Sequence, residues 1–256
     1  MRRRARARQR RAGLGCRVVD GVAWLRLERA RADNRVTIDV AQALSDAAAA
    51  SETDDEVRIV VLAAAGPTFC LGVEAGGDWE QSVDWVGAIA RLTKPVIAAV
   101  QGDAVAEGLE LALACDLRVV SERARFAMPQ VTSGHLPSHG GTQRLPRIVG
   151  RMRALDLLLT GRTIDAREAE EIGLASRLVP HRDFSRAVDA LVDELRVKAP
   201  IALRYAKEAV LAGSDLTFNH GVRLEEDLYA LLQTTRDRRE GVQAFLQKRQ
   251  PVFQGK

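Results

Sequence analysis

The sequence predicts an α/β fold with a largely parallel sheet. Three continuous apolar, β-branched runs indicate strands buried on both faces: VRIVVLAA at 57–64, KPVIAAVQG at 94–102 and DLRVVSE at 116–122. Between the last two lies DAVAEGLELALAC at 103–115, whose apolar residues follow a helical spacing. Strands that alternate with short crossover helices are typical of parallel sheets.

Two elements precede these strands. CRVVDGVAWLRLER at 16–29 contains two alternating runs joined by Asp20-Gly21, the signal of a two-residue hairpin. ALSDAAAASETDDE at 43–56 predicts a helix that frays into an acidic, exposed stretch. The chain therefore enters its sheet through a hairpin and one helix.

After residue 140 the pattern becomes helical. Residues 140–161 predict a helix broken near Pro146 and Gly150. From 183 to 248 the pattern is almost entirely helical, with breaks at Pro200 and Gly213.

A separate short helix is predicted from TIDAREAEEIGLASRLVP at 163–180. Asp165 is its expected N-cap, Glu168 completes a capping box, and Gly173 ends it before a short strand at 174–179. The predicted organisation is an Arg-rich tail at 1–15, an α/β core at 16–198 and a helical region at 199–256.

The positive charge is concentrated in that tail. Residues 1–11 contain seven arginines and no acid, and the net charge of the whole chain is +4, so the rest is slightly acidic. We interpret the tail as a disordered extension. A transit peptide or a nucleic-acid tether is an alternative, but we expect no nucleic-acid partner. No apolar run approaches the ~18 residues that span a bilayer, so neither a membrane segment nor a secretory signal is expected.

The cysteines and histidines predict neither disulfides nor a metal. Cys16, Cys70 and Cys115 are an odd number at wide spacings, which favours core thiols and a reducing cytoplasm. His135 and His139 are separated by Pro137, so they do not share a helical face, and no third ligand is suitably spaced.

One carboxylate lies in a setting suited to proton transfer. Glu110 falls in the first turn of the helix predicted after Gly102, within an otherwise apolar segment. Partial burial would raise its pKa, and the amides of that turn would stabilise a carbonyl oxygen that gains negative charge. The other interpretation is that Glu110 makes only a helix-dipole or ion-pair contact. The Gly-rich stretch GPTFCLGVEAGG at 66–77 offers a second donor turn, and it lacks the dinucleotide and Walker patterns.

Three segments, taken together and in this order, resemble the enoyl-CoA hydratase/isomerase (crotonase) superfamily. They are KPVIAAVQGDAVAEGLELALACDLRVVSERARFAMPQVTSGHLPSHGGTQRLPRIVG, LLLTGRTIDAREAEEIGLASRLVP and RDRREGVQAFLQKRQPVF. The resemblance covers roughly residues 16–253. It implies a crotonase-like fold of repeated ββα units with a C-terminal helical region that forms trimers, often paired into hexamers. It also implies an acyl-CoA substrate and no cofactor beyond that coenzyme A.

The resemblance assigns two backbone amides to an oxyanion hole, those of Val73 and Glu107. They would hold the thioester oxygen and stabilise an enolate. Glu107 replaces a usual glycine, so its side chain must either point away or alter the site. Glu110 matches the first of the two glutamates that share a water in family hydratases.

The second of those positions is Gln130. A carboxamide orients water but cannot accept and return a proton. Isomerases of the family often keep a carboxylate at this position, so isomerase chemistry is also disfavoured. Ser138 and His139 replace small residues, and either could hold water or accept the proton; packing alone is the alternative for His139.

The resemblance also concerns the acyl and coenzyme sites. The segment at 75–93 is shorter than in fatty-acyl hydratases, and Trp79 and Trp85 within it either line a pocket for a cyclic acyl group or pack normally. The coenzyme is expected near four residues, the last two from a neighbouring subunit: Arg35, Tyr229, Phe245 and Lys248. A solvated lysine is the alternative for Lys248.

Three functions follow as hypotheses. The leading one is an acyl-CoA hydratase or lyase that uses Glu110 on a cyclic or dienoyl, rather than straight-chain, CoA ester. The second is hydrolysis or C–C cleavage of a CoA ester with His139 active. The third is a CoA-binding subunit with little catalysis, motivated by Gln130.

Overall fold

A computed structural model of the chain describes residues 9–76, 79 and 83–256. The described residues divide into two compact units, the first comprising residues 9–92 and 96–189 and the second residues 93–95 and 190–256. The division falls within α7 (Phe184–Arg196), so it precedes the boundary predicted at residue 198.

The first unit is built on a seven-stranded sheet with the order β1-β2-β3-β4-β5-β7-β10. The β1–β2 and β2–β3 pairs are antiparallel, and the remaining pairs are parallel. The strands are β1 (Gln9–Arg11), β2 (Leu14–Val19), β3 (Val22–Leu27), β4 (Ile59–Ala64), β5 (Val96–Val100), β7 (Leu117–Ser121) and β10 (Arg177–Val179). The predicted α/β organisation with a largely parallel sheet is therefore confirmed.

The N-terminal hairpin is confirmed in detail. Val19 pairs with Val22, and Asp20 (φ 49°) and Gly21 (φ 81°) both have positive φ, as a type I′ turn requires. The predicted tail at 1–15 is too long, because β1 begins at Gln9 and β2 at Leu14. Residues 1–8, where the rest of that prediction falls, lie outside the described residues.

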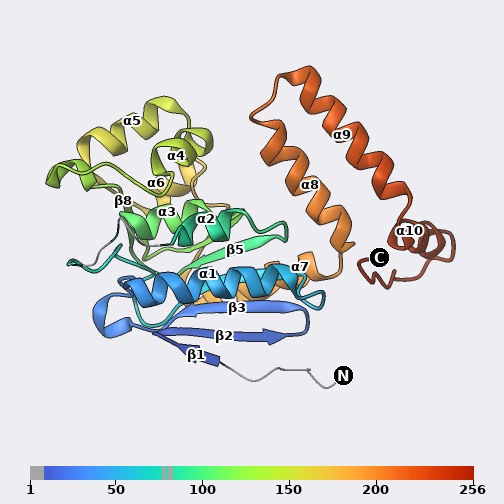
Figure 1. Ribbon diagram of the computed structural model, residues 1–256, viewed down its shortest axis with the longest axis horizontal. Coiled ribbons are helices and arrows are strands. Elements are labelled where there is room, and N and C mark those ends of the chain that lie inside the picture. The colour runs from blue at the N-terminus through green and yellow to red at the C-terminus, as the bar shows by residue number, and fades with distance from the viewer. Residues whose placement is uncertain (1–8, 77–78, 80–82) are drawn as a thin grey trace. The chain divides into compact units, whose positions relative to one another are not determined.

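Helices α1 (Ile38–Thr53), α2 (Trp85–Ala90) and α3 (Glu107–Leu113) connect these strands. Figure 1 shows α1 running alongside β3. The side chains of β5 are buried along its whole length, and those of β4 are buried over its first four residues. Such burial on both faces explains why these strands are continuous apolar runs in the sequence.

The first unit also contains a three-stranded sheet with the order β6-β8-β9. Its strands are β6 (Ala104–Val105), β8 (Arg125–Ala127) and β9 (Thr163–Asp165). Helices α4 (Gly141–Val149) and α5 (Arg151–Thr160) connect β8 to β9, and α6 (Ala166–Glu171) follows β9 and packs against both strands. Pro146 lies inside α4 and does not break it, contrary to the prediction. The break falls at Gly150, whose φ of 82° favours glycine.

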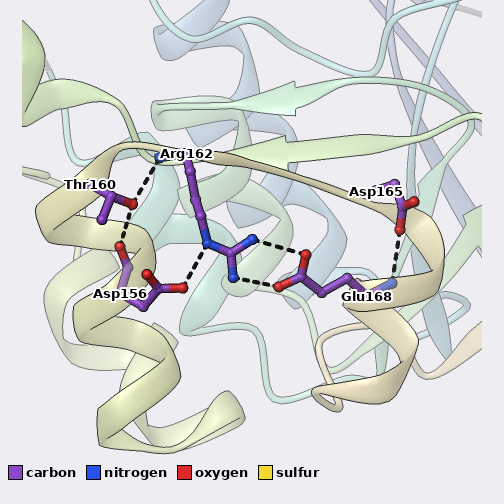
Figure 2. Close-up of polar contacts among 5 residues, drawn as sticks. All are labelled: Asp156, Thr160, Arg162, Asp165 and Glu168. Atoms are coloured by element: carbon purple, nitrogen blue, oxygen red, sulfur yellow. Dashed lines mark hydrogen bonds and ion pairs between the residues drawn. The ribbon is translucent and has the colours of Figure 1, made fainter.

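The predicted capping box of α6 forms only in part (Figure 2). The Asp165 carboxylate caps the helix by accepting from the Glu168 amide at 2.9 Å. The Glu168 carboxylate does not complete the box, because it accepts two hydrogen bonds from Arg162, whose Nε also donates to Asp156 at 2.6 Å. These ion pairs are exposed, so we expect each to stabilise the fold by no more than about 1 kcal/mol.

The second unit is helical, with α8 (Pro200–Gly213), α9 (Phe218–Gln233) and α10 (Arg236–Leu246). Pro200 is the first residue of α8 and Gly213 its last, as predicted from the breaks in the pattern. No helix among the described residues combines the length and the apolar content needed to cross a bilayer.

Candidate active site

The site lies in the first unit, where the loop at 66–73 packs closely against the turn before α3. The Cys70 amide donates to Asp103 O at 3.0 Å, and the Val105 amide donates to Cys70 O at 3.0 Å. A Cβ at Gly102 would lie 1.7 Å from Pro67 O. Backbone atoms approach here more closely than any side chain permits, so the turn before α3 is fixed against the loop at 66–73.

This approach orients the Val73 amide. Val36 pairs with Val73 as a parallel bridge: the Val36 amide donates to Gly72 O at 2.9 Å, and the Glu74 amide donates to Val36 O at 2.8 Å. Because amides alternate in direction along an extended segment, the Val73 N–H points away from Val36. It points instead toward the start of α3.

The Val73 amide meets the side chain of Glu107 there. It donates to Glu107 Oε2 at 3.1 Å. Glu107 is the first residue of α3, and its side chain is half-buried. Of the two possibilities open from the sequence, the structure shows the second: the Glu107 side chain does not point away but enters the predicted oxyanion hole.

Ala106, which precedes Glu107, has an unusual backbone conformation. Its φ of 53° and ψ of −124° form a combination that favours glycine. We expect Ala106→Gly to raise the free energy of unfolding by about 1 kcal/mol, because it removes this strain. Urea denaturation would measure the change. Ala49→Gly, on the exposed face of α1, is the matched control and should lower stability by about 1 kcal/mol; equal losses in the two variants would contradict the prediction.

Glu110 is fully buried and held from one side. Its Oε1 accepts from the amides of His139 and Gly141, each at 2.8 Å, whereas Oε2 is buried with no hydrogen-bond partner. Burial raises the pKa of the carboxyl group, and the surrounding amides only partly offset the effect. A fixed carboxylate with a raised pKa and one free oxygen is suited to general acid–base chemistry.

Two further buried polar groups lack partners among the described residues. Gln130, in the short helix η3 (Gln130–Ser133), has neither its Oε1 nor its Nε2 hydrogen-bonded, and Trp85 Nε1 is also unpaired. Buried polar atoms normally find a partner, so this pattern is typical of a site that takes a ligand or water. The amide of Gln130 can donate and accept, but it cannot carry the proton.

His139 links two of these groups. Its backbone amide binds Glu110, and its ring meets Trp85 edge-on with centroids 5.2 Å apart. Burial lowers the pKa of the His139 imidazole, and Arg144 lowers it further, against the opposing charges of Glu107 and Asp84. The neutral ring packs against Trp85, which lies in the core.

Three polar side chains that the sequence did not single out hold the segments on either side of Val73. Asn34 Nδ2 donates to Ala65 O and Thr68 O, and Gln101 Nε2 also donates to Thr68 O. Arg29 donates to the Glu74 carboxylate. Asn34 has a φ of 52°, and an asparagine in a polar stretch was the only signal that could have indicated it.

The remaining predicted residues fall in different places. Arg35 donates to Leu71 O and Val73 O, so it braces the candidate oxyanion loop. Ser138 is exposed. The other coenzyme candidates belong to the second unit and are all exposed there: Tyr229, Phe245 and Lys248. Among the described residues no group of three His, Cys, Asp or Glu side chains is arranged to hold a metal.

The cysteines are free thiols. Cys70 and Cys115 are buried and Cys16 is half-buried. Burial raises the pKa of the Cys70 thiol to about 12, so Cys70 is not suited to act as a nucleophile although it lies in the loop that leads to Val73.

The fold is α/β, and the site places a buried carboxylate beside two closely packed turns. Comparisons with known proteins identify the family. The enoyl-CoA hydratase/isomerase family matches residues 17–256, so the chain belongs to this family. The chain is 37% identical over 211 residues to enoyl-CoA isomerase/hydratase fer4 of Mycosarcoma maydis, covering 78% of this chain and 77% of that protein.

Two further similarities are informative. The chain is 34% identical over 253 residues to the (E)-benzylidenesuccinyl-CoA hydratase of Thauera aromatica, covering 93% of this chain and 97% of that protein. The crystal structure of enoyl-CoA hydratase from Bacillus anthracis superposes with a TM-score of 0.90 at 34% identity, over 95% of this chain and all of that one. The predicted crotonase-like fold is therefore confirmed.

Proposed function

We propose that the protein is an acyl-CoA hydratase or lyase in which Glu110 moves the proton and the Val73 and Glu107 amides stabilise a thioester enolate. One observation carries the proposal: the buried Glu110 carboxylate is fixed by two amides through one oxygen while the other oxygen is free. Membership of the family supports action on acyl-CoA esters.

The substrate we propose is a cyclic or dienoyl CoA ester. Gln130 supplies no second carboxylate, so water activation falls to Glu110 alone. In a conjugated dienoyl ester the enolate delocalises charge toward remote carbons, and one carboxylate can then suffice. The half-buried His139 ring, packed edge-on against the buried Trp85, is an aromatic surface near Glu110 that is compatible with a planar acyl group.

The test compares hydration of crotonyl-CoA and of a cyclic dienoyl-CoA by the purified chain. We expect the dienoyl ester to turn over at least about tenfold faster, because hydration of crotonyl-CoA would lack a second positioned acid–base group, which typically contributes about 10²–10⁴-fold. Faster hydration of crotonyl-CoA would contradict the substrate assignment. His139→Ala should leave hydration largely intact; its loss, together with release of free CoA, would favour hydrolysis or C–C cleavage by His139.

A CoA-binding subunit with little catalysis is the second candidate, and the Glu107 carboxylate on the Val73 amide favours it. Gln130→Glu distinguishes the two candidates. A strong gain of crotonyl-CoA hydration would show an otherwise competent site. Binding of CoA esters without turnover in either form would support the binding subunit.

We propose that the chain assembles as a homotrimer or a hexamer. Several large apolar side chains of the second unit are more than half exposed, among them Val210, Leu211, Phe218, Leu231 and Phe245. Sedimentation of the purified chain measures the assembly state. A cytoplasmic location remains a prediction from the free thiols.

A further inference from the structure

The Glu107 carboxylate packs directly on the peptide that would receive a thioester oxygen. The Val73 N–H donates to its Oε2 at 3.1 Å, and a Cβ built at Gly72 would lie only 2.5 Å from the same oxygen. Two independent measures thus place this oxygen against the 72–73 peptide. Because Val36 binds the residues on either side of Val73, the amide has no freedom to turn away from it.

An amide N–H has a single hydrogen, and a hydrogen bond to a carboxylate is stronger than one to a neutral carbonyl. A thioester oxygen can therefore bind the Val73 amide only by displacing Glu107. We propose that Glu107 is a specificity-determining residue: its carboxylate is an internal competitor for the oxyanion hole, and it selects neutral acyl groups over acyl groups that carry a carboxylate. This inference rests on the proposed function.

The charges around the site support the selectivity. The displaced Glu107 carboxylate remains on the first turn of α3 together with Glu110, close enough to act electrostatically on both Glu110 and His139. Asp84 and Arg144 also act electrostatically on His139, but with opposite sign, and Asp84 is paired with Arg91 at 2.7 Å. An acyl group with its own carboxylate would therefore face the carboxylates of Glu107 and Glu110, and this like charge costs affinity.

Two saturated probes of equal chain length test this without turnover: butyryl-CoA, which is neutral, and succinyl-CoA, which ends in a carboxylate. Isothermal titration calorimetry would give the Kd of each for the parent, Glu107→Gln and Glu107→Ala. We expect Glu107→Ala to bind butyryl-CoA about tenfold more tightly than the parent, with Glu107→Gln between them because its neutral amide oxygen still reaches Val73. The parent should bind butyryl-CoA at least about tenfold more tightly than succinyl-CoA. The ratio of these two Kd values should be smaller in both variants than in the parent.

Glu170→Ala, an exposed glutamate on α6, is the matched control and should leave both Kd values unchanged. Circular dichroism checks folding, and Glu107→Gln carries the test alone if Glu107→Ala does not fold. Binding by Glu107→Ala but not by the parent would strongly support the inference.

Equal Kd values in the parent and both variants would overturn the inference and leave the proposed function standing. The absence of any CoA-ester binding by the folded parent and folded variants would overturn the proposed function, and the inference with it.

Discussion

Glu110→Gln is expected to lower turnover of an enoyl-CoA or dienoyl-CoA ester by about 10²–10⁴-fold, the usual contribution of a positioned acid–base group. The amide keeps the shape of the side chain, and its oxygen can still accept from His139 and Gly141, so the loss reports the missing proton transfer. Steady-state kinetics with the parent and variant measure it. KM should change little compared with kcat, because the carboxylate does not hold the coenzyme.

The pH dependence of the parent provides a second readout. Burial raises the pKa of Glu110 above its ordinary 4.5, and the carboxylate form is the one that accepts a proton from water. Turnover should therefore rise with pH through a midpoint above 4.5 and then level off. Unchanged turnover in Glu110→Gln would remove this residue from the mechanism.

The same substitution should stabilise the fold at neutral pH. The pKa of Glu110 is raised in the folded state, so the folded chain binds this proton more tightly than the unfolded chain. Stability is thus lost as pH rises from 4.5 through the folded pKa, and the deficit is complete above it. Glu110→Gln removes the deficit, so we expect it to raise the free energy of unfolding at pH 8 and to change it little at pH 4, measured by urea denaturation.

The strands that support the site could be predicted from the sequence. The contacts that form the site, between residues far apart in the chain, could not. β4, β5 and β7 were predicted because burial on both faces demands continuous apolar runs. β6, β8 and β9 were missed because their two or three residues carry no periodicity, whereas the equally short β10 lies within the longer predicted strand at 174–179. Their pairing depends on the fold and not on local pattern.

The orientation of the Glu107 side chain could not be predicted from the sequence either. The family resemblance assigned its amide, with that of Val73, to an oxyanion hole, but the direction of its carboxylate depends on how the loop at 66–73 packs against α3. Pro146 was misjudged because it is the sixth of the nine residues of α4 and removes one intrahelical hydrogen bond, which the helix tolerates; the positive φ of Gly150 ends α4 instead.

Gly108→Ala is expected to cause a large loss of stability. Its Cβ would lie 2.0 Å from Cys70 O and 2.7 Å from Cys70 C, well inside the closest approach of real atoms. Cys70 O already accepts from the Val105 amide, so this backbone cannot retreat without breaking that bond. We expect the free energy of unfolding to fall by about 4 kcal/mol or more, seen in urea denaturation or as loss of soluble protein.

Gly241→Ala separates this effect from the general cost of replacing a glycine. A Cβ at Gly241, in α10, meets only the Phe253 ring at an ordinary 3.7 Å, so the helix should gain about 0.5–1 kcal/mol. If Gly108→Ala still folds, the separation between the Val73 and Glu107 amides must grow, and turnover should fall by about 10²-fold. A Gly108→Ala variant with the stability and turnover of the parent would show that the two loops are not pressed together, and the oxyanion hole would lose its structural basis.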